Sequence, residues 1–458
     1  MKKTNLSLIG LSLLAIQGGA QTKTAQPNFV IVIGDDCSYS DLNLHGGPNT
    51  KNPNINALAK EGMMFNYCFQ AASMSSPTRH CLYTGIYPVR NGAYPNHTFC
   101  YDNINSFVQY FRPAGYRTAL YGKQHVAPKT VFSYDYLGDY RNGEMDFDKI
   151  KNYITGEPSP FFMVVASHES HSPWNVGDPS QWDPNKIVLP PHLVDTDRTR
   201  NQFVRYLAEI EVLDSQVGNV MKILKETGLF ENTVFVFLSE QGNSFPFAKW
   251  TCYNQGLHSA MVVSYPPKIK PNTVSNALVE YVDILPTFLD IAGIKTEEGQ
   301  LDGKSFFPVL QQKTDEHKTY TFAIHTTRGI IDGSDYFGIR SAATKQYRFI
   351  LNLTPEAEFN NVNTNAGNQI WQSWKSAANS NPFAAQRVYD YQHRPAEELY
   401  DIVNDPYEFK NLANDPAYAT IKKELSNALE QWMLQQGDKG QETEMKAFER
   451  QVKGAEGD

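Results

Sequence analysis

The sequence predicts an α/β protein whose central, mostly parallel sheet is flanked by helices, followed by a smaller C-terminal α+β subdomain with an antiparallel sheet. Apolar runs rich in β-branched and aromatic residues have the pattern of strands buried on both faces, and they lie at 27–34, 160–167 and 232–238. The longest helical pattern, 201–226, carries one apolar stripe. Beyond Phe307 this periodicity weakens, and short strands are expected at 320–325, 336–340 and 347–351.

The first twenty residues have the pattern of a secretory signal peptide, with Lys2 and Lys3, an apolar run over 6–16, and then Gly18-Gly19-Ala20. The run is too short to span a bilayer, and no Cys follows the small residues, so no membrane anchor is expected. We therefore expect an exported protein, periplasmic in a bacterium or secreted. The remaining chain is expected to divide into a large α/β domain at 21–310, a subdomain at 311–436 and a polar, frayed tail at 437–458.

Composition narrows the class of partner. The net charge is −8 and no basic run is present, which argues against nucleic acid as a partner. The five cysteines include no C-x-x-C pair and indicate no disulfide framework. A local basic pocket would still be enough to bind a polyanionic substrate.

Polar side chains follow the predicted buried strands where each strand ends. They are Asp35-Asp36 after 27–34, Lys123 and His125 after 117–121, His171 after 160–167, and Glu240-Gln241 after 232–238, with Lys249 a little further on. Parallel strands bring their carboxyl ends to one edge of the sheet, so we expect these groups to meet there. Lys123 and His125, two positions apart in extended chain, are expected to point the same way.

The four residues Asp35, Asp36, Glu240 and Gln241 offer only oxygen ligands. Adjacent carboxylates repel each other unless a cation or hydrogen bonds compensate. An all-oxygen set suits Ca²⁺ or Mg²⁺ and not a thiol-preferring metal. The sequence therefore predicts a divalent-cation site at this edge.

Further elements connect these strands. Helices are expected at 54–62, 104–114, 284–292 and 418–436, and another strand at 261–264. The segment 356–385 is rich in Asn, Ala and Ser and shows few signals of a buried strand. None of these segments carries an obvious chemical role.

A Ser-x-Pro-x-Arg pattern at Ser75, Pro77 and Arg79 lies between the first two predicted buried strands. Pro77 suits the first turn of a helix, where its missing N–H costs nothing. Ser75 is then expected just before that helix, where unpaired N–H groups favour an anion. Arg79 lies one turn further on and can face the same anion.

Together these segments resemble type I sulfatases of the alkaline-phosphatase superfamily over nearly the whole mature chain. The family signature begins with Cys or Ser, here Ser75. Further matching motifs are Asp35-Asp36, Gly122-Lys123-x-His125, Ala166-Ser167-His168-Glu169-Ser170-His171-Ser172-Pro173, and Glu398-Leu399-Tyr400-Asp401-Ile402-x-x-Asp405-Pro406-x-Glu408-x-x-Asn411-Leu412. The resemblance implies an alkaline-phosphatase-like large domain and sulfatase activity on a sulfated carbohydrate.

The resemblance also implies roles for the residues. Ser75 would be oxidised to formylglycine (3-oxoalanine), whose hydrate attacks sulfur. Arg79, Lys123 and Lys249 would neutralise the sulfate oxygens. His171 or Lys249 would protonate the leaving sugar oxygen, and His125 would help to expel sulfate. Ca²⁺, or Mg²⁺ in its place, would be held by Asp35, Asp36, Glu240 and Gln241.

Two positions depart from the usual family pattern. Glu240-Gln241 stands where the family usually has Asp followed by Asn or His, so each arm is longer by a methylene. The nucleophile position is Ser, which is typical of bacterial members that depend on an anaerobic sulfatase-maturating enzyme. That enzyme is accordingly an expected partner.

Segments 122–132 and 242–250 look most like the heparan N-sulfatase (sulfamidase) branch of the family. This favours a glycosaminoglycan or mucin-type glycan, with N- or O-sulfate on an amino sugar. Candidate substrate-binding residues are His97, His325, Arg328 and Arg340. Two alternatives stay open, namely a phosphatase or phosphonate hydrolase of the same superfamily and a catalytically inactive protein that binds sulfated glycans.

Overall fold

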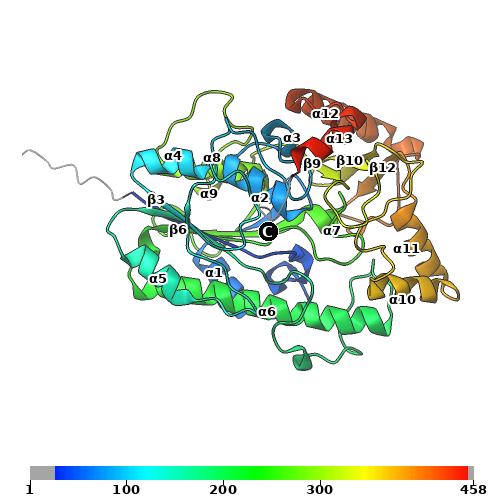
Figure 1. Cartoon of the computed structure of the whole chain (residues 1–458), viewed down its shortest axis with the longest axis horizontal. Helices are drawn as coiled ribbons and strands as arrows, with labels where there is room; N and C mark the ends of the chain where they lie inside the picture. Colours follow the sequence, from blue (N-terminus) through cyan, green and yellow to red (C-terminus); the bar gives the residue numbers. More distant parts are fainter. Residues whose placement is uncertain (1–25, 452–458) are drawn as a thin grey trace, which may run out of the picture.

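The computed structural model describes residues 26–451, and Figure 1 shows a large sheet between layers of helices beside a smaller C-terminal part. The predicted signal peptide, 1–20, lies outside the described residues. The large sheet has eight strands in the order β4-β3-β5-β1-β6-β7-β2-β8. They are β1 (Asn28–Ile33), β2 (Met63–Phe69), β3 (Arg117–Gly122), β4 (Asp135–Tyr136), β5 (Phe161–Ala166), β6 (Thr233–Leu238), β7 (His258–Ser264) and β8 (Thr273–Glu280).

The pairing in this sheet confirms the mostly parallel arrangement. Every neighbouring pair is parallel except the two that involve β7, which runs antiparallel to β6 and to β2. The four strands β3, β5, β1 and β6 are adjacent in that order. Their carboxyl ends therefore lie side by side at one edge, where α/β folds place ligands.

Helices cover both faces of the sheet. Figure 1 shows α2, α4 and α8 on one face and α1, α5 and α6 on the other. The helices of this part are α1 (Pro53–Glu61), α2 (Ser75–Thr84), α3 (Pro88–Asn91), α4 (Phe107–Phe111), α5 (Phe147–Thr155), α6 (Asp197–Glu226), α7 (Asn254–Leu257), α8 (Ile284–Ala292) and α9 (Phe307–Leu310).

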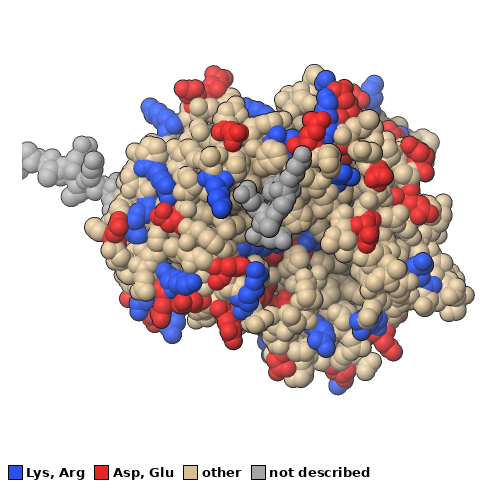
Figure 2. All heavy atoms as spheres, viewed as in Figure 1, with Lys and Arg blue, Asp and Glu red and all other residues tan. Residues whose placement is uncertain are grey.

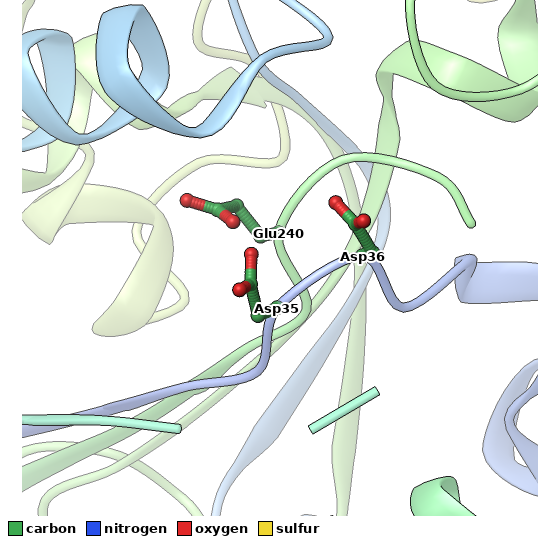
Figure 3. Close-up of side chains that lie close together, drawn as sticks. All are labelled: Asp35, Asp36 and Glu240. Carbon is green, nitrogen blue, oxygen red and sulfur yellow. The ribbon is translucent and has the colours of Figure 1, made fainter. Parts of the chain in front are cut away.

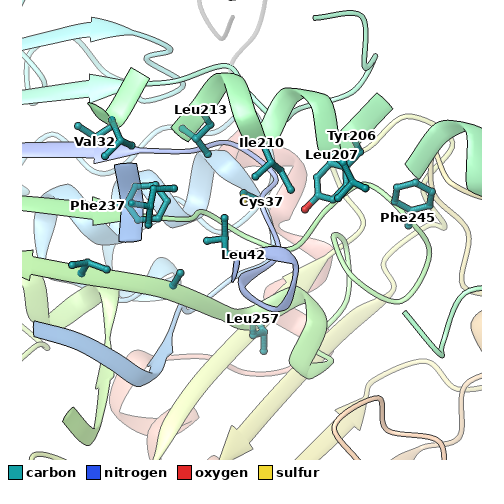
Figure 4. Packing of buried hydrophobic residues seen from close by; sticks show 14 of the residues in the cluster. Val32, Cys37, Leu42, Tyr206, Leu207, Ile210, Leu213, Phe237, Phe245 and Leu257 are labelled. Carbon is teal, nitrogen blue, oxygen red and sulfur yellow. The ribbon is translucent and has the colours of Figure 1, made fainter. Parts of the chain in front are cut away.

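Strand β1 is buried on both faces because its side chains alternate between two cores. Phe29 and Ile31 belong to the core under α4 and α8, whereas Val30 and Val32 belong to the core under α6. Figure 4 shows this second core, with Leu207, Ile210 and Leu213 of α6 packed over the sheet. The apolar stripe of 201–226 is thus confirmed as core packing.

The C-terminal part holds a four-stranded antiparallel sheet in the order β12-β11-β10-β9. This confirms the predicted smaller α+β unit. Its strands are β9 (Thr321–Thr326), β10 (Gly338–Ala343), β11 (Tyr347–Asn352) and β12 (Glu397–Asp401), and its helices are α10 (Gln369–Ala378), α11 (Pro382–Gln392), α12 (Ala419–Gln436) and α13 (Gln441–Met445).

The tail from 437 onward was expected to fray, and for 437–451 that prediction is wrong. The segment continues into α13 and a short 3₁₀ turn over Ala447–Arg450. Glu444 and Asp438 both form ion pairs with the buried Arg340 of β10, and Glu444 is 2.8 Å from its Nη1. A buried guanidinium is stable only when it is paired with negative charge. These two ion pairs therefore hold the segment 437–451 against the small sheet.

The surface, the thiols and the helix lengths give three further observations. Figure 2 shows Lys and Arg interspersed with Asp and Glu over the visible face. All five cysteines lie within the described residues, where each is buried and unpaired. Across residues 26–451, no helix combines the length and the apolar character needed to cross a membrane.

Candidate active site

Three carboxylates converge at the carboxyl ends of β1 and β6. Asp35 and Asp36 directly follow β1, Glu240 follows β6, and all three are fully buried. One oxygen from each carboxylate lies within 4.8 Å of the others, and Figure 3 shows the three side chains close together at the strand ends. The predicted convergence of these strand ends is therefore present in the structure.

The amide of Gln241 completes this cluster. Its Nε2 donates to Oδ1 of Asp36 over 2.6 Å, while its buried Oε1 has no hydrogen-bond partner. Nε2 is the atom that faces Asp36 and Ser75, so a half-turn of the amide would bring the unpartnered Oε1 to the cluster as a fourth oxygen ligand. The donor set therefore fits a hard divalent cation such as Ca²⁺ or Mg²⁺.

The three buried carboxylates lie close enough together to repel one another when no cation is bound. Burial and the neighbouring Asp35 carboxylate raise the pKa of Glu240 to about 8, although Arg79 opposes the shift. Burial also acts to raise the pKa of Asp35, but Lys123 and His171 outweigh it and hold that pKa well below its usual range. Closely spaced buried carboxylates of this kind are stabilised by added positive charge.

Ser75 is the first residue of α2 and not the residue before it, because Met74 occupies the N-cap position. Its hydroxyl points into the carboxylate cluster. Oγ lies 3.0 Å from Oδ1 of Asp35 and 2.9 Å from Oε2 of Glu240, and it accepts from Nε2 of Gln241 over 2.8 Å. The side chain of residue 75 is thus held against the candidate metal ligands.

Three cations surround this hydroxyl, each engaged with one of the carboxylates. The fully buried Arg79 donates from Nε to Oε1 of Glu240 over 2.8 Å, and its Nη2 has no hydrogen-bond partner, although it lies 3.9 Å from Oδ1 of Asp35. Lys123 Nζ lies 2.5 Å from Oδ2 of Asp35, and Lys249 Nζ lies 2.7 Å from Oδ2 of Asp36. The arrangement offers concentrated positive charge to an anion placed at residue 75.

His171 contacts the same group from the loop after β5. Its Nε2 lies 3.1 Å from Nζ of Lys249 and 3.5 Å from Oδ2 of Asp36. Burial and the charge of Lys249 lower the pKa of His171. Its Nδ1 lies 2.5 Å from the carbonyl oxygen of Ser172, which fixes the ring orientation.

His125 and His97 form a pair, with Nε2 of His125 lying 3.2 Å from Nδ1 of His97. The backbone at His125 has φ 54°, so the chain is not extended there as predicted. Lys123 and His125 nevertheless both line the same cavity. Burial and the charge of Lys123 hold the pKa of His125 well below its usual range.

A cavity of about 580 Å³ opens above Ser75. Its walls come from both parts of the fold. Sequence reasoning missed most of the wall residues, which include Asp139, Arg141, His168, Trp174, Ser244, Trp250, Ile330, Ile331, Asn363 and Asn368. They lie on loops without a hydrophobic period, and only their proximity to strand ends or motif residues could have drawn attention to a few of them.

Of the four candidate substrate-binding residues, only His97 lines this cavity. The prediction is wrong for His325 and Arg340, which are fully buried in the small sheet. Arg340 is neutralised by its acidic partners, so it is not available to a sugar. Arg328 lies outside the cavity lining and stacks on the ring of Phe448, with its guanidinium carbon 4.6 Å from the centroid.

The C-terminal segment holds the loop that carries His97. Arg450 donates from Nε to the carbonyl of Gly92 over 2.9 Å and from Nη2 to the carbonyl of Phe99 over 2.7 Å. Its guanidinium also stacks on the rings of Phe99 and Tyr101. These contacts fix both ends of the loop and therefore the position of His97.

We expect Arg450→Ala to lower kcat/KM by roughly 10-fold or more, because a small displacement of cavity residues weakens productive binding. Initial rates with a substrate that the protein turns over would measure the effect. Lys446→Ala is the matched control, because it removes an exposed ion pair with Glu442 from the same segment. Equal rates for the two variants would show that Arg450 does not position the loop.

Comparison with known proteins identifies the family. Residues 27–294 match the family described as Sulfatase, and residues 242–365 match the family described as N-sulphoglucosamine sulphohydrolase, C-terminal. The chain belongs to the sulfatase family. It is therefore a sulfuric ester hydrolase, and the expected family resemblance is confirmed.

Individual sulfatases resemble this chain over most of its length. An ulvan-active sulfatase of Formosa agariphila is 32% identical over 424 residues, which are 90% of this chain and 81% of the relative. The N-sulphoglucosamine sulphohydrolase of Homo sapiens is 25% identical over 462 residues and 90% of each chain. A structure solved with its substrate D-glucosamine-2-N,6-O-disulfate has a TM-score of 0.70 at 20% identity, covering 91% of this chain and 99% of that one.

Proposed function

We propose that this sulfatase hydrolyses sulfate groups from sulfated carbohydrates, with a preference for N- or O-sulfate on an amino sugar of a glycosaminoglycan or mucin-type glycan. The observation that carries this proposal is the position of Ser75. Its hydroxyl lies against Asp35, Glu240 and Gln241 at the floor of a cavity large enough for a sugar. The similarity to a glucosamine sulphohydrolase supports the amino-sugar preference.

Ser75 acts in its oxidised form, and its hydrated aldehyde supplies the oxygen that attacks sulfur. An anaerobic sulfatase-maturating enzyme performs the oxidation in a bacterial host. The N-terminal signal of the sulfatase directs the sulfatase itself to the periplasm or outside the cell. A Ca²⁺ or Mg²⁺ ion held by Asp35, Asp36, Glu240 and Gln241 supplies Lewis-acid charge at the sulfate oxygens when bound. Ser75 and the four proposed metal ligands are themselves buried at the floor of the cavity.

The cations of the site stabilise the charge that builds on the sulfate group. Arg79, Lys123 and Lys249 already oppose the three carboxylates, so they are preorganised and need little rearrangement when the anion enters. His171 and Lys249 are adjacent, and one of the two would protonate the leaving oxygen or nitrogen of the sugar. His125 lies beside His97 on the cavity wall and assists sulfate departure from residue 75.

We expect His171→Ala to slow hydrolysis of a sugar sulfate by about 100-fold or more, since a positioned general acid contributes on that order. The loss should be much smaller with a nitrophenyl sulfate, because its leaving phenolate needs no proton. Comparing kcat for the two substrates in both proteins measures this. Equal losses on both would indicate that His171 has a structural role and leave Lys249 as the acid.

A panel of glucosamine saccharides sulfated at the 2-N, 2-O, 3-O or 6-O position tests the proposed function. The protein should be produced with a maturating enzyme, and inorganic sulfate should be measured by ion chromatography. Release from one class of substrate is expected. A phosphate and a phosphonate monoester belong in the same panel, since faster hydrolysis of either would favour the alternative activity.

The arrangement of the lysines favours a sulfatase over a phosphatase, whereas a phosphonate monoester carries the same single charge as a sulfate monoester and is separated from it by the assay panel. Lys123 and Lys249 lie on Asp35 and Asp36, at the positions where a second metal ion would otherwise supply charge. A single divalent cation with two lysines suits a sulfate monoester, which carries less charge than a phosphate monoester. An inactive glycan-binding protein would release no sulfate even after Ser75 is oxidised.

A further inference from the structure

We propose that Arg141, His168 and Asp139 form a second subsite, which binds a second anionic substituent of the sugar substrate, either a further sulfate or a carboxylate. The inference rests on the proposed function and concerns the wall of the same cavity. All three side chains line it. None of them is among the residues that surround Ser75.

The positive charges that line the cavity are not all used at the candidate metal site. Across the described residues, the Lys and Arg side chains that line it are Lys123, Lys249 and Arg141. The two lysines are bound to the carboxylates of the candidate metal site. Arg141 is the remaining one, and 77% of its side chain is exposed. It is therefore accessible to a substituent that lies away from the scissile sulfate.

Asp139 holds both of the other side chains of the subsite in place. One of its oxygens, Oδ1, lies 2.6 Å from Nε2 of His168, and the other, Oδ2, lies 3.2 Å from Nη2 of Arg141. The ion pair engages one nitrogen of a guanidinium that carries five N–H donors. The rest of the fork can therefore bind a sulfate or carboxylate in two-point fashion without releasing Asp139.

Buried hydrogen bonds attach the loop that carries Asp139 and Arg141 to the loop after β5. Tyr140 lies between Asp139 and Arg141 in sequence and is buried. Its hydroxyl donates to Oε2 of Glu169 over 2.7 Å and accepts from the backbone N–H of His168 over 3.0 Å. The same Glu169 oxygen accepts from Gln216 over 2.7 Å. This buried network ties the subsite to the loop that carries His171.

Rigid attachment matters because a preorganised site avoids the entropic cost of ordering a loop when ligand binds. It also sets the direction of the second group, since His168 of the subsite and His171 share the loop after β5, and Asp139 joins His168 to Arg141 on the loop after β4. A sugar with its scissile sulfate at Ser75 would then present its second anion toward Arg141. The subsite would select among sulfated sugars by the position of that second anion.

The test compares one mono-sulfated sugar that the enzyme cleaves with two derivatives of it. One derivative carries an additional sulfate, and the other is linked to a uronic acid. In Arg141→Ala, the ratio of kcat/KM for at least one derivative to kcat/KM for the parent sugar should fall by about 10-fold, as expected when a charge-assisted contact is lost. The derivative that responds identifies the anion as sulfate or carboxylate.

Arg112→Ala is the matched control, because Arg112 makes an exposed ion pair with Asp135 at 2.9 Å and does not line the cavity. Ratios for Arg141→Ala that match those of this control for both derivatives would overturn the subsite. Calorimetric binding of the disulfated sugar to Ser75→Ala, with and without Arg141→Ala, gives a readout without turnover. If wild-type protein releases sulfate from no sugar, the proposed function fails, whereas an Arg141-dependent affinity would still support the subsite.

Discussion

Replacing Ser75 with Ala is expected to reduce sulfate release by at least about 1,000-fold, to the level of the uncatalysed background. The substitution removes the only atom from which the nucleophile can be made. It leaves Arg79, Lys123 and the carboxylate cluster in place, so binding of the substrate should largely survive. The loss should therefore fall on kcat and not on affinity for the sugar.

Ser76→Ala is a demanding control for this prediction. Ser76 is the next residue of α2 and equally buried, but it does not line the cavity, and its Oγ accepts from the backbone N–H of Thr98. It should retain most activity. Similar residual rates in the two variants would mean that the hydroxyl of residue 75 is not the source of the nucleophile.

Removal of the divalent cation should have a comparably large effect. Chelation is expected to abolish turnover, and Ca²⁺ or Mg²⁺ should restore it. Stability gives an independent readout, because a cation at 100 times its Kd stabilises the folded protein by about 2.7 kcal/mol. The wild-type Tm should accordingly rise by a few degrees when the cation is added back.

Asp36→Asn should abolish this thermal response. Asp36 accepts from Gln241 through one oxygen and from Ser244 and Lys249 through the other, so its charge organises one side of the cluster. Asp302→Asn is the control, since it alters a carboxylate that pairs with Arg90 outside the cavity. If neither Ca²⁺ nor Mg²⁺ changed the Tm or the activity of the wild-type protein, the metal site would be refuted.

Site residues could be predicted from the sequence wherever polar side chains directly follow a buried strand. The runs that became β1, β5 and β6 are largely continuous and apolar, β3 is a shorter run that begins with Arg117 and Thr118, and parallel pairing brings the ends of all four strands together. Asp35, Lys123, His171 and Glu240 therefore lie near one another in the structure as predicted. The position of Ser75 depended instead on a helix start that local pattern fixes only to within a residue.

Elements with weaker local signals were missed. Strand β2 contains Asn66, and β8 has exposed residues at alternate positions near its start, so neither shows a continuous apolar run. Helix α10 and the start of α11 occupy the segment rich in Asn, Ala and Ser; the buried Trp371 and Trp374 supply core contacts for α10, and the buried Tyr391 does so for α11. Their stability comes from tertiary packing more than from intrinsic propensity.

Long-range partners explain the wrong substrate residues. Arg340 looked available because an isolated Arg on a short strand is usually exposed. Its partner Asp438 lies 98 positions later in the chain, on a segment expected to fray. No local pattern connects the two. The proposed subsite could not be predicted from the sequence for the same reason. Asp139 and His168 are 29 positions apart and lie on two different loops.

The most direct test of the central claim joins the oxidation state of Ser75 to turnover. The protein would be produced with and without an anaerobic maturating enzyme, and the mass of the peptide that contains residue 75 would be compared with sulfate release from sulfated glucosamine. We predict that activity rises in proportion to the fraction of peptide lighter by two hydrogen atoms, and that it is absent when Ser75 is unmodified. Equal sulfate release by fully unmodified protein would contradict the account.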